Sequence, residues 1–470
     1  MNQRKYTVSD INVDIGIAYN HLLSLTITSK QGEHGKLSLV LEIMEETTQA
    51  DIMGCKETAV VVSLKSGERL FSGICLNVAL SSMGGYKCVR VDAYTASAMM
   101  DKERKKTVFQ DPAKTLQGML EHVCKPYNTL LTLDNDPIIS QIEYQQNETD
   151  WVFLKRMAAC QGKAVFTDTA QSGIVIYCGE KGFRRYDESC LGEECGISRD
   201  VGELARAAAA GESVSGYMFD NKEYNSAIPY IVAGDMVGDI YCVRGTEVTL
   251  EKGILNNRIS LGYIDSIRPT VAESTQPAFT SGIIMGTVLN VSGNEVQVKY
   301  DSDSGVGGTA WIPYESAISN SFYCMPDMGD KVYVYQQNDG NAICLGSCHV
   351  NTEQPDFSKP EENVLTNHDK MIKMGETSLT ITSTRKSFEN EDGEEFTIKM
   401  DEEEGISISS NKDIYLETTE YLFMGCRVQE YQGRLYVNGQ KILRERVGKG
   451  EAEYERESLE LEGFGLSQVP

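Results

Sequence analysis

The first hundred residues alternate between apolar and polar positions. The alternation runs through residues 22–28, 37–43, 60–64 and 86–94, and short turn sequences separate neighbouring runs. A period of two residues is typical of strands that bury one face. Several such strands joined by tight turns predict a barrel or a sandwich, and we assign a β-barrel to residues 1–105.

Residues 106–180 have a different pattern, in which apolar side chains recur at helical spacing. The first such stretch is residues 115–124. A second helix is expected to begin at Thr149 or Asp150, either of which can cap a helix N-terminus, and to end at Gly162. Strand-like runs follow it, so this region is predicted to be a small α+β module.

Strand patterns return further along the chain. Residues 181–268 predict a second β-barrel, although the alanine run at 207–210 leaves a helix open there. A polar, proline-containing linker is expected at 269–280. Five short strands in residues 281–350 predict an OB-fold domain, and 351–365 read as a second linker.

Residues 366–424 carry a single narrow apolar stripe. Short apolar pairs and triplets alternate with Ser, Thr, Lys and Asp, which predicts strands of three to five residues separated by charged turns. The stripe is Leu379, Ile381, Phe396, Ile398, Met400, Ile406, Ile408, Ile414 and Leu416. A narrow isolated ribbon is not stable in water. We therefore expect identical chains to cover one another's stripes, as an intertwined trimeric β-prism or β-helix. Residues 425–470 are an acidic C-terminal extension. The fold class is mainly β.

Charge and apolar content narrow the possible partners. The chain has 44 basic and 69 acidic residues, a net charge of −25, and 24 of the acidic side chains lie in residues 361–470. Nucleic acid and anionic membrane surfaces both require a basic excess, so neither is an expected partner. The start lacks the apolar core of a signal peptide, and no stretch reaches the roughly 18 apolar residues of a membrane span. Thirteen scattered cysteines suit a reducing compartment, so we expect cytoplasmic assembly.

Four groups of residues are considered as metal sites. Cys344, Cys348 and His349 lack a fourth ligand candidate, and Cys190 and Cys195 form only a pair, so both groups are interpreted as buried structural cysteines. The sequence Asp301-x-Asp303-x-Gly305 opens like a calcium loop, but position 12 is Ile312 rather than an acid. Glu389 to Glu404 is interpreted as a pair of solvated turns rather than a cation site. No metal and no cofactor is expected.

Enzyme chemistry has little support in the sequence. The five histidines do not stand in a serine or cysteine nucleophile motif, although a glycosidase-type carboxylate pair stays open because acids are abundant. Asp150 and Trp151 are interpreted as helix cap and core. We therefore expect no catalytic residues and no enzymatic activity.

Four segments resemble spike proteins of the valine-glycine-repeat (VgrG) family and the related phage tail hubs. Residues 143–158 are similar to the family's acidic cap followed by a Trp/Phe-Leu-x-Arg helix. The runs 71–74 and 89–94 look like the family's first barrel. Parts of the family's OB domain are similar to Trp311–Ile312, Met325–Val332 and Leu345–Ser347. The start of the family's needle is similar to Gly405–Thr418.

The resemblance implies a homotrimeric hub-spike of a phage-tail-like contractile injection system. In such a particle the hub would adjoin the inner tube protein and baseplate proteins, and a PAAR-like tip protein or an effector would sit at the C-terminal end. Residues 451–462 are then either an exposed tail or a docking segment. No lysozyme-like insert is seen, and the last histidine is His368, so no iron site is expected at the tip. A trimeric tail-fibre adhesin and a tail-associated wall hydrolase are the alternative hypotheses.

Overall fold

The structure is a computed structural model, and it divides into two compact units that are described separately below. Unit 1 is Met1–His349 and unit 2 is Val350–Pro470. The residues that the structure describes are 5–53, 58–179, 182–209, 211, 215–269, 281–316, 324–337, 341–348, 359, 361–367, 369–387, 390–411 and 414.

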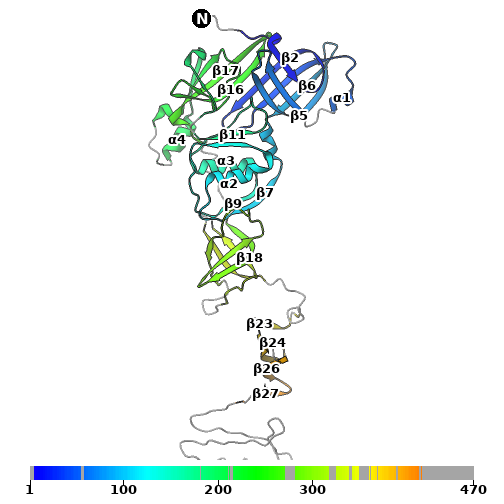
Figure 1. Ribbon diagram of the computed structural model, residues 1–470, viewed down its shortest axis with the longest axis vertical. Coiled ribbons are helices and arrows are strands. Elements are labelled where there is room, and N and C mark those ends of the chain that lie inside the picture. The colour runs from blue at the N-terminus through cyan, green and yellow to red at the C-terminus, as the bar shows by residue number, and fades with distance from the viewer. Residues whose placement is uncertain are drawn as a thin grey trace, which may run out of the picture. The chain divides into compact units, whose positions relative to one another are not determined.

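A twelve-stranded sheet forms the first part of unit 1 (Figure 1). Its main path runs β1-β4-β5-β6-β3-β2-β16-β17-β14-β13, and β12 and β15 pair beside β16. The strands of the N-terminal half are β1 (Ile11–Asp14), β2 (Tyr19–Lys30), β3 (Lys36–Ile43), β4 (Ala59–Leu64), β5 (Arg69–Met83) and β6 (Tyr86–Tyr94). The remaining strands are β12 (Arg185–Tyr186), β13 (Leu191–Arg199), β14 (Asp220–Ser226), β15 (Met236–Val237), β16 (Tyr241–Glu251) and β17 (Ile254–Tyr263). Short helices η1 (Val8–Asp10) and α1 (Gln49–Met53) accompany the first half.

The β16–β17 hairpin belongs to both halves of this sheet. Near its tip, Val248 and Leu255 are buried in the core of the N-terminal half. Near its base, Val243, Ile259 and Leu261 are buried in a separate core of the second half. The two regions in which the sequence predicted separate barrels are therefore joined through one hairpin.

The second half also contains the alanine run for which the sequence left the secondary structure open, and a helix is found there. Helix α4 spans Val201–Ala209 and begins directly after β13. Ala207 is its one buried residue among those that the structure describes. This half also contains three short helices, η4 (Glu188–Cys190), η5 (Gly216–Phe219) and η6 (Ile264–Ser266).

The α+β module lies between the two halves of the sheet in the sequence. Its strands are β7 (Arg104–Phe109), β8 (Leu130–Leu133), β9 (Glu143–Thr149), β10 (Val165–Thr167) and β11 (Val175–Cys178). Its helices are η2 (Ala96–Asp101), α2 (Leu116–Cys124), η3 (Lys125–Tyr127) and α3 (Asp150–Cys160). Thr149 caps α3 by accepting a hydrogen bond from the backbone of Val152 at 3.2 Å. Gly162, with a φ of +68°, follows the helix in the left-handed conformation that glycine adopts easily. Both helix predictions are confirmed.

A five-stranded sheet closes unit 1. Its order is β20-β19-β18-β21-β22, from β18 (Gly282–Ser292), β19 (Glu295–Tyr300), β20 (Trp311–Pro313), β21 (Lys331–Gln336) and β22 (Ala342–Ser347). Its core includes Val108 and Tyr144 from the preceding module. The buried Tyr144 hydroxyl donates to Oε1 of Gln336 at 2.7 Å. The module and this sheet are therefore packed together.

Unit 2 is an antiparallel meander of five strands. They are β23 (Asn363–Asn367), β24 (Lys370–Met374), β25 (Ser378–Ser387), β26 (Asn390–Asp401) and β27 (Gly405–Ser410), paired in chain order. None of the described residues of this unit for which exposure is known is buried. The chain is mainly β, as predicted.

Two details of the prediction for this unit are wrong. Strands β25 and β26 have ten and twelve residues rather than three to five. Glu389 itself lies outside the described residues. From Asn390 to Asp401 the acidic run continues the backbone ladder, in which Arg385 pairs with Glu394, and Glu402 to Glu404 form a turn. Charged residues can continue a strand because the ladder is formed by backbone groups.

No helix among the described residues is long and apolar enough to cross a membrane.

A buried acid makes the stability of unit 1 dependent on pH. Asp235 is fully buried and accepts hydrogen bonds from the backbone of Val232 at 2.9 Å and from Nε of Arg184 at 3.2 Å. Burial raises the pKa of Asp235 to about 7, although the Arg184 charge opposes the shift. A carboxyl with a raised folded-state pKa stabilises the fold below its unfolded pKa and loses that contribution as the pH rises through about 7.

We expect Asp235→Asn to remove this pH dependence. Between pH 5 and 7 the wild-type chain should lose up to about 1.4 kcal/mol of unfolding free energy per pH unit relative to the variant. Urea unfolding followed by circular dichroism at several pH values measures the difference. Asp239→Asn is the matched control, because the Asp239 side chain is 88% exposed. Parallel pH profiles for wild type and Asp235→Asn would contradict the expectation.

Candidate functional site

The cysteines interpreted as buried structural residues lie in different environments. Cys344 and Cys348 are buried, Cys190 lies in the core, and His349 is outside the described residues. Cys195 is exposed on β13, so its prediction as a buried residue is wrong. Strand β13 is an edge strand with two register shifts, which turn several of its side chains towards solvent. Among the described residues no group of three or more His, Cys, Asp or Glu could hold a metal ion.

The acidic loop at Asp301 is engaged by the protein itself. Asp301 forms an ion pair with Lys331 at 2.5 Å. Asp303 accepts a hydrogen bond from the backbone of Gly305 at 2.7 Å and another from the side-chain amide of Gln110. These oxygens stabilise the loop, as the solvated-loop interpretation expects.

Asp150 is not the helix cap but a buried carboxylate that joins three elements. Its oxygens accept hydrogen bonds from Tyr127 and Gln145, both at 2.7 Å, and form an ion pair with Lys105 at 2.5 Å. Trp151 is buried, as predicted for a core residue. The sequence pattern marks the position of Asp150, but it cannot show partners that lie on other elements.

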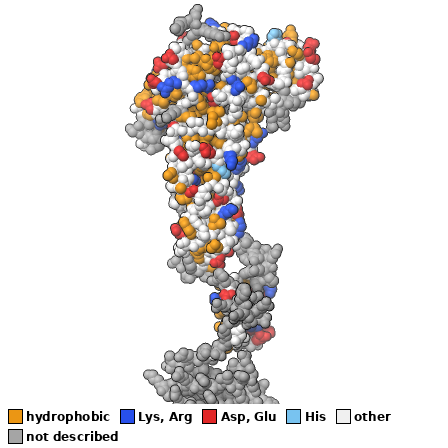
Figure 2. Space-filling view, in the orientation of Figure 1, with side chains coloured by type: hydrophobic (Ala, Val, Ile, Leu, Met, Phe, Trp, Pro, Cys, Tyr) orange, Lys and Arg blue, Asp and Glu red, His pale blue; other side chains and the backbone are white. Residues whose placement is uncertain are grey.

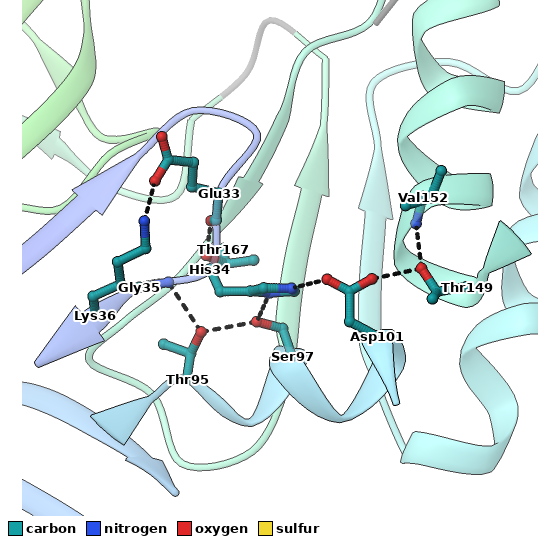
Figure 3. Close-up of polar contacts among 10 residues, drawn as sticks. All are labelled: Glu33, His34, Gly35, Lys36, Thr95, Ser97, Asp101, Thr149, Val152 and Thr167. Carbon is teal, nitrogen blue, oxygen red and sulfur yellow. Dashed lines mark hydrogen bonds and ion pairs between the residues drawn. The ribbon is translucent and has the colours of Figure 1, made fainter. Parts of the chain in front are cut away.

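A serine, a histidine and an aspartate form a chain of hydrogen bonds that sequence reasoning missed (Figure 3). Nδ1 of His34 lies 2.8 Å from the Ser97 hydroxyl, and Nε2 lies 2.9 Å from the Asp101 carboxylate. The other oxygen of that carboxylate accepts a hydrogen bond from Thr149, the cap of α3, at 2.5 Å. The Trp151 ring lies 4.4 Å from the imidazole, centroid to centroid.

This arrangement resembles a catalytic triad in composition only. A nucleophilic serine must reach a substrate carbonyl, whereas Ser97 is 1% exposed and its hydroxyl also bonds Thr95 at 2.8 Å. The three residues come from the turn after β2 and from η2. Their contacts join that turn to the N-terminus of α3, which is a structural role. No sequence motif links positions 34, 97 and 101.

A buried arginine forms a second polar cluster in the same module. Arg156 on α3 is 1% exposed and pairs with Glu148 at 3.0 Å and more distantly with Glu143 at 3.8 Å. It also donates to the backbone oxygen of Tyr144 at 2.5 Å. Burial raises the pKa of Glu143, and the Arg156 charge opposes that shift. The cluster ties α3 to β9 and leaves no side chain free for chemistry.

The clearest candidate for function is the apolar face of the unit 2 sheet. Cross-strand pairs place Leu365, Ile372, Ile381, Ile398 and Ile408 in one continuous row. A second row on the same face is formed by Met374, Leu379, Met400 and Ile406. All of these side chains except Leu379, which is half-buried, are at least 38% exposed. We call these nine residues the apolar ladder.

The opposite face of the same sheet is mainly polar, although Val364 and Met371 also lie on it. It presents Thr366, Lys373, Thr380, Thr382, Thr397, Lys399, Ser407 and Ser409. Lys373 and Lys399 form ion pairs with Glu362 at 2.6 Å and Asp401 at 3.1 Å. A sheet with one apolar and one polar face normally covers its apolar face with another layer. Here no described residue buries the ladder.

Comparison with known proteins identifies the fold. No protein-family model matches the chain, and no curated protein sequence matches it. The E. coli c3393 protein, described as a type VI secretion component with structural similarity to T4 bacteriophage tail proteins gp27 and gp5, is similar over 72% of this chain and 99% of its own. The TM-score is 0.52 and the sequence identity 13%.

A second similar structure is a VgrG protein. The lidded PdpA–VgrG complex from Francisella matches over 86% of this chain and 80% of the matched chain, with a TM-score of 0.50 and 8% identity. At identities this low, the structural similarity establishes the fold but says nothing about the roles of individual residues. The chain has the fold of VgrG-like proteins of type VI secretion systems and of phage tail hub-spike proteins.

Proposed function

We propose that this chain is the structural hub-spike of a phage-tail-like contractile injection system. Unit 1 would be the hub that adjoins the inner tube and baseplate proteins, and unit 2 would be the start of the puncturing needle. The spike would be assembled in the cytoplasm and leave the cell when the particle fires. A PAAR-like tip protein or an effector would attach at the C-terminal end.

The apolar ladder is the observation that carries this proposal. One layer of strands cannot remove its own apolar face from water, and each fully buried aliphatic side chain contributes about 1.5–3 kcal/mol. A second copy of the chain offers a ladder of identical shape and spacing. Three copies, wound about one axis with their ladders inward, would bury all three faces and expose the three polar ones.

The alternatives fit the described residues less well. A tail-fibre adhesin would also trimerise through such a ladder, but the similarity of the chain to a type VI secretion component and to a PdpA–VgrG complex supports the spike instead. A wall hydrolase needs an exposed catalytic group, and the one triad-like arrangement among the described residues encloses its serine. Sustained turnover of peptidoglycan by the purified chain would overturn the non-enzymatic assignment.

The ladder predicts that single substitutions on opposite faces of one strand have opposite outcomes. Ile398→Asp places a carboxylate in the proposed interface of every copy, and an uncompensated buried charge costs roughly 3–5 kcal/mol. Sedimentation velocity should show trimers for the wild type and monomers for Ile398→Asp. Thr397→Asp is the matched control, because Thr397 is the neighbouring residue on the polar face, and it should remain trimeric.

A wild-type chain that sediments as a stable, folded monomer would contradict the proposal. So would dissociation of Thr397→Asp to the same extent as Ile398→Asp, because the effect would then not depend on the face.

The C-terminal extension is proposed to attach cargo or a tip protein rather than to hold the trimer together. Deleting residues 425–470, which lie outside the described residues, should leave a trimer, so that sedimentation equilibrium gives three times the mass of the shortened chain. Co-purification of tip or effector proteins from the producing cells should be lost. If the trimer dissociates instead, the extension belongs to the needle.

A further inference from the structure

The outer face of the five-stranded sheet in unit 1 carries an apolar patch that no contact described above accounts for. Cross-strand pairing places Ile283 beside Tyr335, and Tyr335 beside Ile343. The neighbouring row pairs Met285 with Tyr333. Tyr335 and Ile343 are half-buried. We call these five residues the outer patch, because they point away from the core of the sheet.

Alternation along the strands separates the outer patch from that core. On β21, Val332 and Val334 are fully buried, whereas Tyr333 between them is 43% exposed. On β18, Ile283 is 61% exposed and Met285 is 37% exposed. The sheet therefore buries one face and leaves large apolar side chains of the other face in water.

The row of Met285 and Tyr333 reaches β22 at a residue without a side chain. Gly346 pairs with Tyr333, and a Cβ at this glycine would meet no described atom within 4 Å. The space beside Tyr333 on this strand is therefore unfilled, and a side chain of another molecule could enter it.

The outer patch differs from the ordinary surface of the protein because its members are contiguous. Figure 2 shows hydrophobic side chains scattered among polar and charged ones over the visible face of unit 1. Single exposed apolar residues are common and need no partner. Here two adjacent rows meet, and the next row, which pairs Thr287 with Lys299 and Lys331, is polar. An apolar centre with a polar rim and exposed tyrosines is typical of protein–protein interfaces.

The composition of the outer patch and its tether both favour a second copy of this chain as the occupant. The five side chains carry no charge, so the patch cannot select a partner by electrostatic attraction, and proximity has more weight. Cys348 of unit 1 and Asn363 of unit 2 are fifteen residues apart in the sequence. A chain of that length spans at most roughly 50–55 Å in any conformation. Copies joined through their apolar ladders would therefore hold their outer patches at an effective concentration of about 1 mM.

We propose that the outer patches of three copies meet around the axis of the trimer and form a second interface, separate from the apolar ladder. Each patch would then be covered by the same surface of the other two copies. This inference rests on the proposed trimer, and it adds that unit 1 itself holds the copies together.

Site-specific photocrosslinking of the full-length chain tests this contact. Ile283→p-benzoylphenylalanine should give covalent dimers and trimers on irradiation, with crosslinks that mass spectrometry maps to the five-stranded sheet of another copy. Asn290→p-benzoylphenylalanine is the matched control, because Asn290 is an exposed residue of the same strand outside the outer patch. It should give no covalent trimer. Combining Ile283→p-benzoylphenylalanine with Ile398→Asp should abolish the crosslinks, since the ladder would no longer bring the copies together.

Dissociation of the trimer on dilution gives a second measurement. Mass photometry should show that Ile283→Asp raises the dissociation constant of the trimer by about ten-fold or more, whereas Asn290→Asp leaves it near the wild-type value. Ile283→Val should also behave like the wild type, because it keeps the apolar contact. Met285→Gln is a milder variant should Ile283→Asp unfold the chain, which circular dichroism would reveal.

Two results would overturn the second interface. One is a wild-type trimer in which position 283 gives no crosslink to another copy, or crosslinks instead to a different protein of the producing cells. The other is equal trimer dissociation for Ile283→Asp and Asn290→Asp. Both leave the proposed spike function standing, whereas a wild-type chain that is monomeric in sedimentation removes that function and this contact together.

Discussion

The exposure of the apolar ladder in unit 2 is the constraint on which the functional interpretation depends. Five antiparallel strands place nine aliphatic or methionine side chains on one face, and no described residue of the chain covers them. Because the opposite face carries mainly Thr, Ser and Lys, only burial of the apolar face is favourable. Other copies of the same chain could cover the ladder most simply, since their own rows of apolar side chains have the same spacing.

Unit 1, by contrast, contains several small hydrophobic cores that are joined to one another. The β16–β17 hairpin contributes to two cores, and Tyr144 carries a hydrogen bond from the α+β module into the core of the five-stranded sheet. Buried charges reinforce these joints: Asp150 links β7 and η3 to α3, and Arg156 ties α3 to β9.

The same structure shows how groups with catalytic potential can serve structure alone. Ser97, His34 and Asp101 are within hydrogen-bond distance of one another, yet the serine is enclosed and the aspartate also binds the cap of α3. Composition alone does not reveal this structural role, whereas the burial of the serine and the second partner of the aspartate do.

The sequence by itself determined the local features of this protein. Alternation predicted the strands, Thr149 and Gly162 marked the ends of α3, and the row of Ile398, Met400, Ile406 and Ile408 predicted an apolar face without a partner. These features depend on residues that are close in the chain, so short-range periodicity reveals them. The length of β25 and β26 escaped prediction, because backbone groups form the ladder and charged side chains do not interrupt it.

Only the tertiary structure decided which distant residues meet. The pairing of β2 with β16 joins segments more than two hundred residues apart and creates a cavity lined by Lys30 and Arg244. The exposure of Cys195 follows from the place of β13 at the edge of the sheet, and the partners of Asp150 come from other elements. No periodicity encodes such contacts, because they arise from the packing of whole elements, whose free energy is spread over many weak interactions.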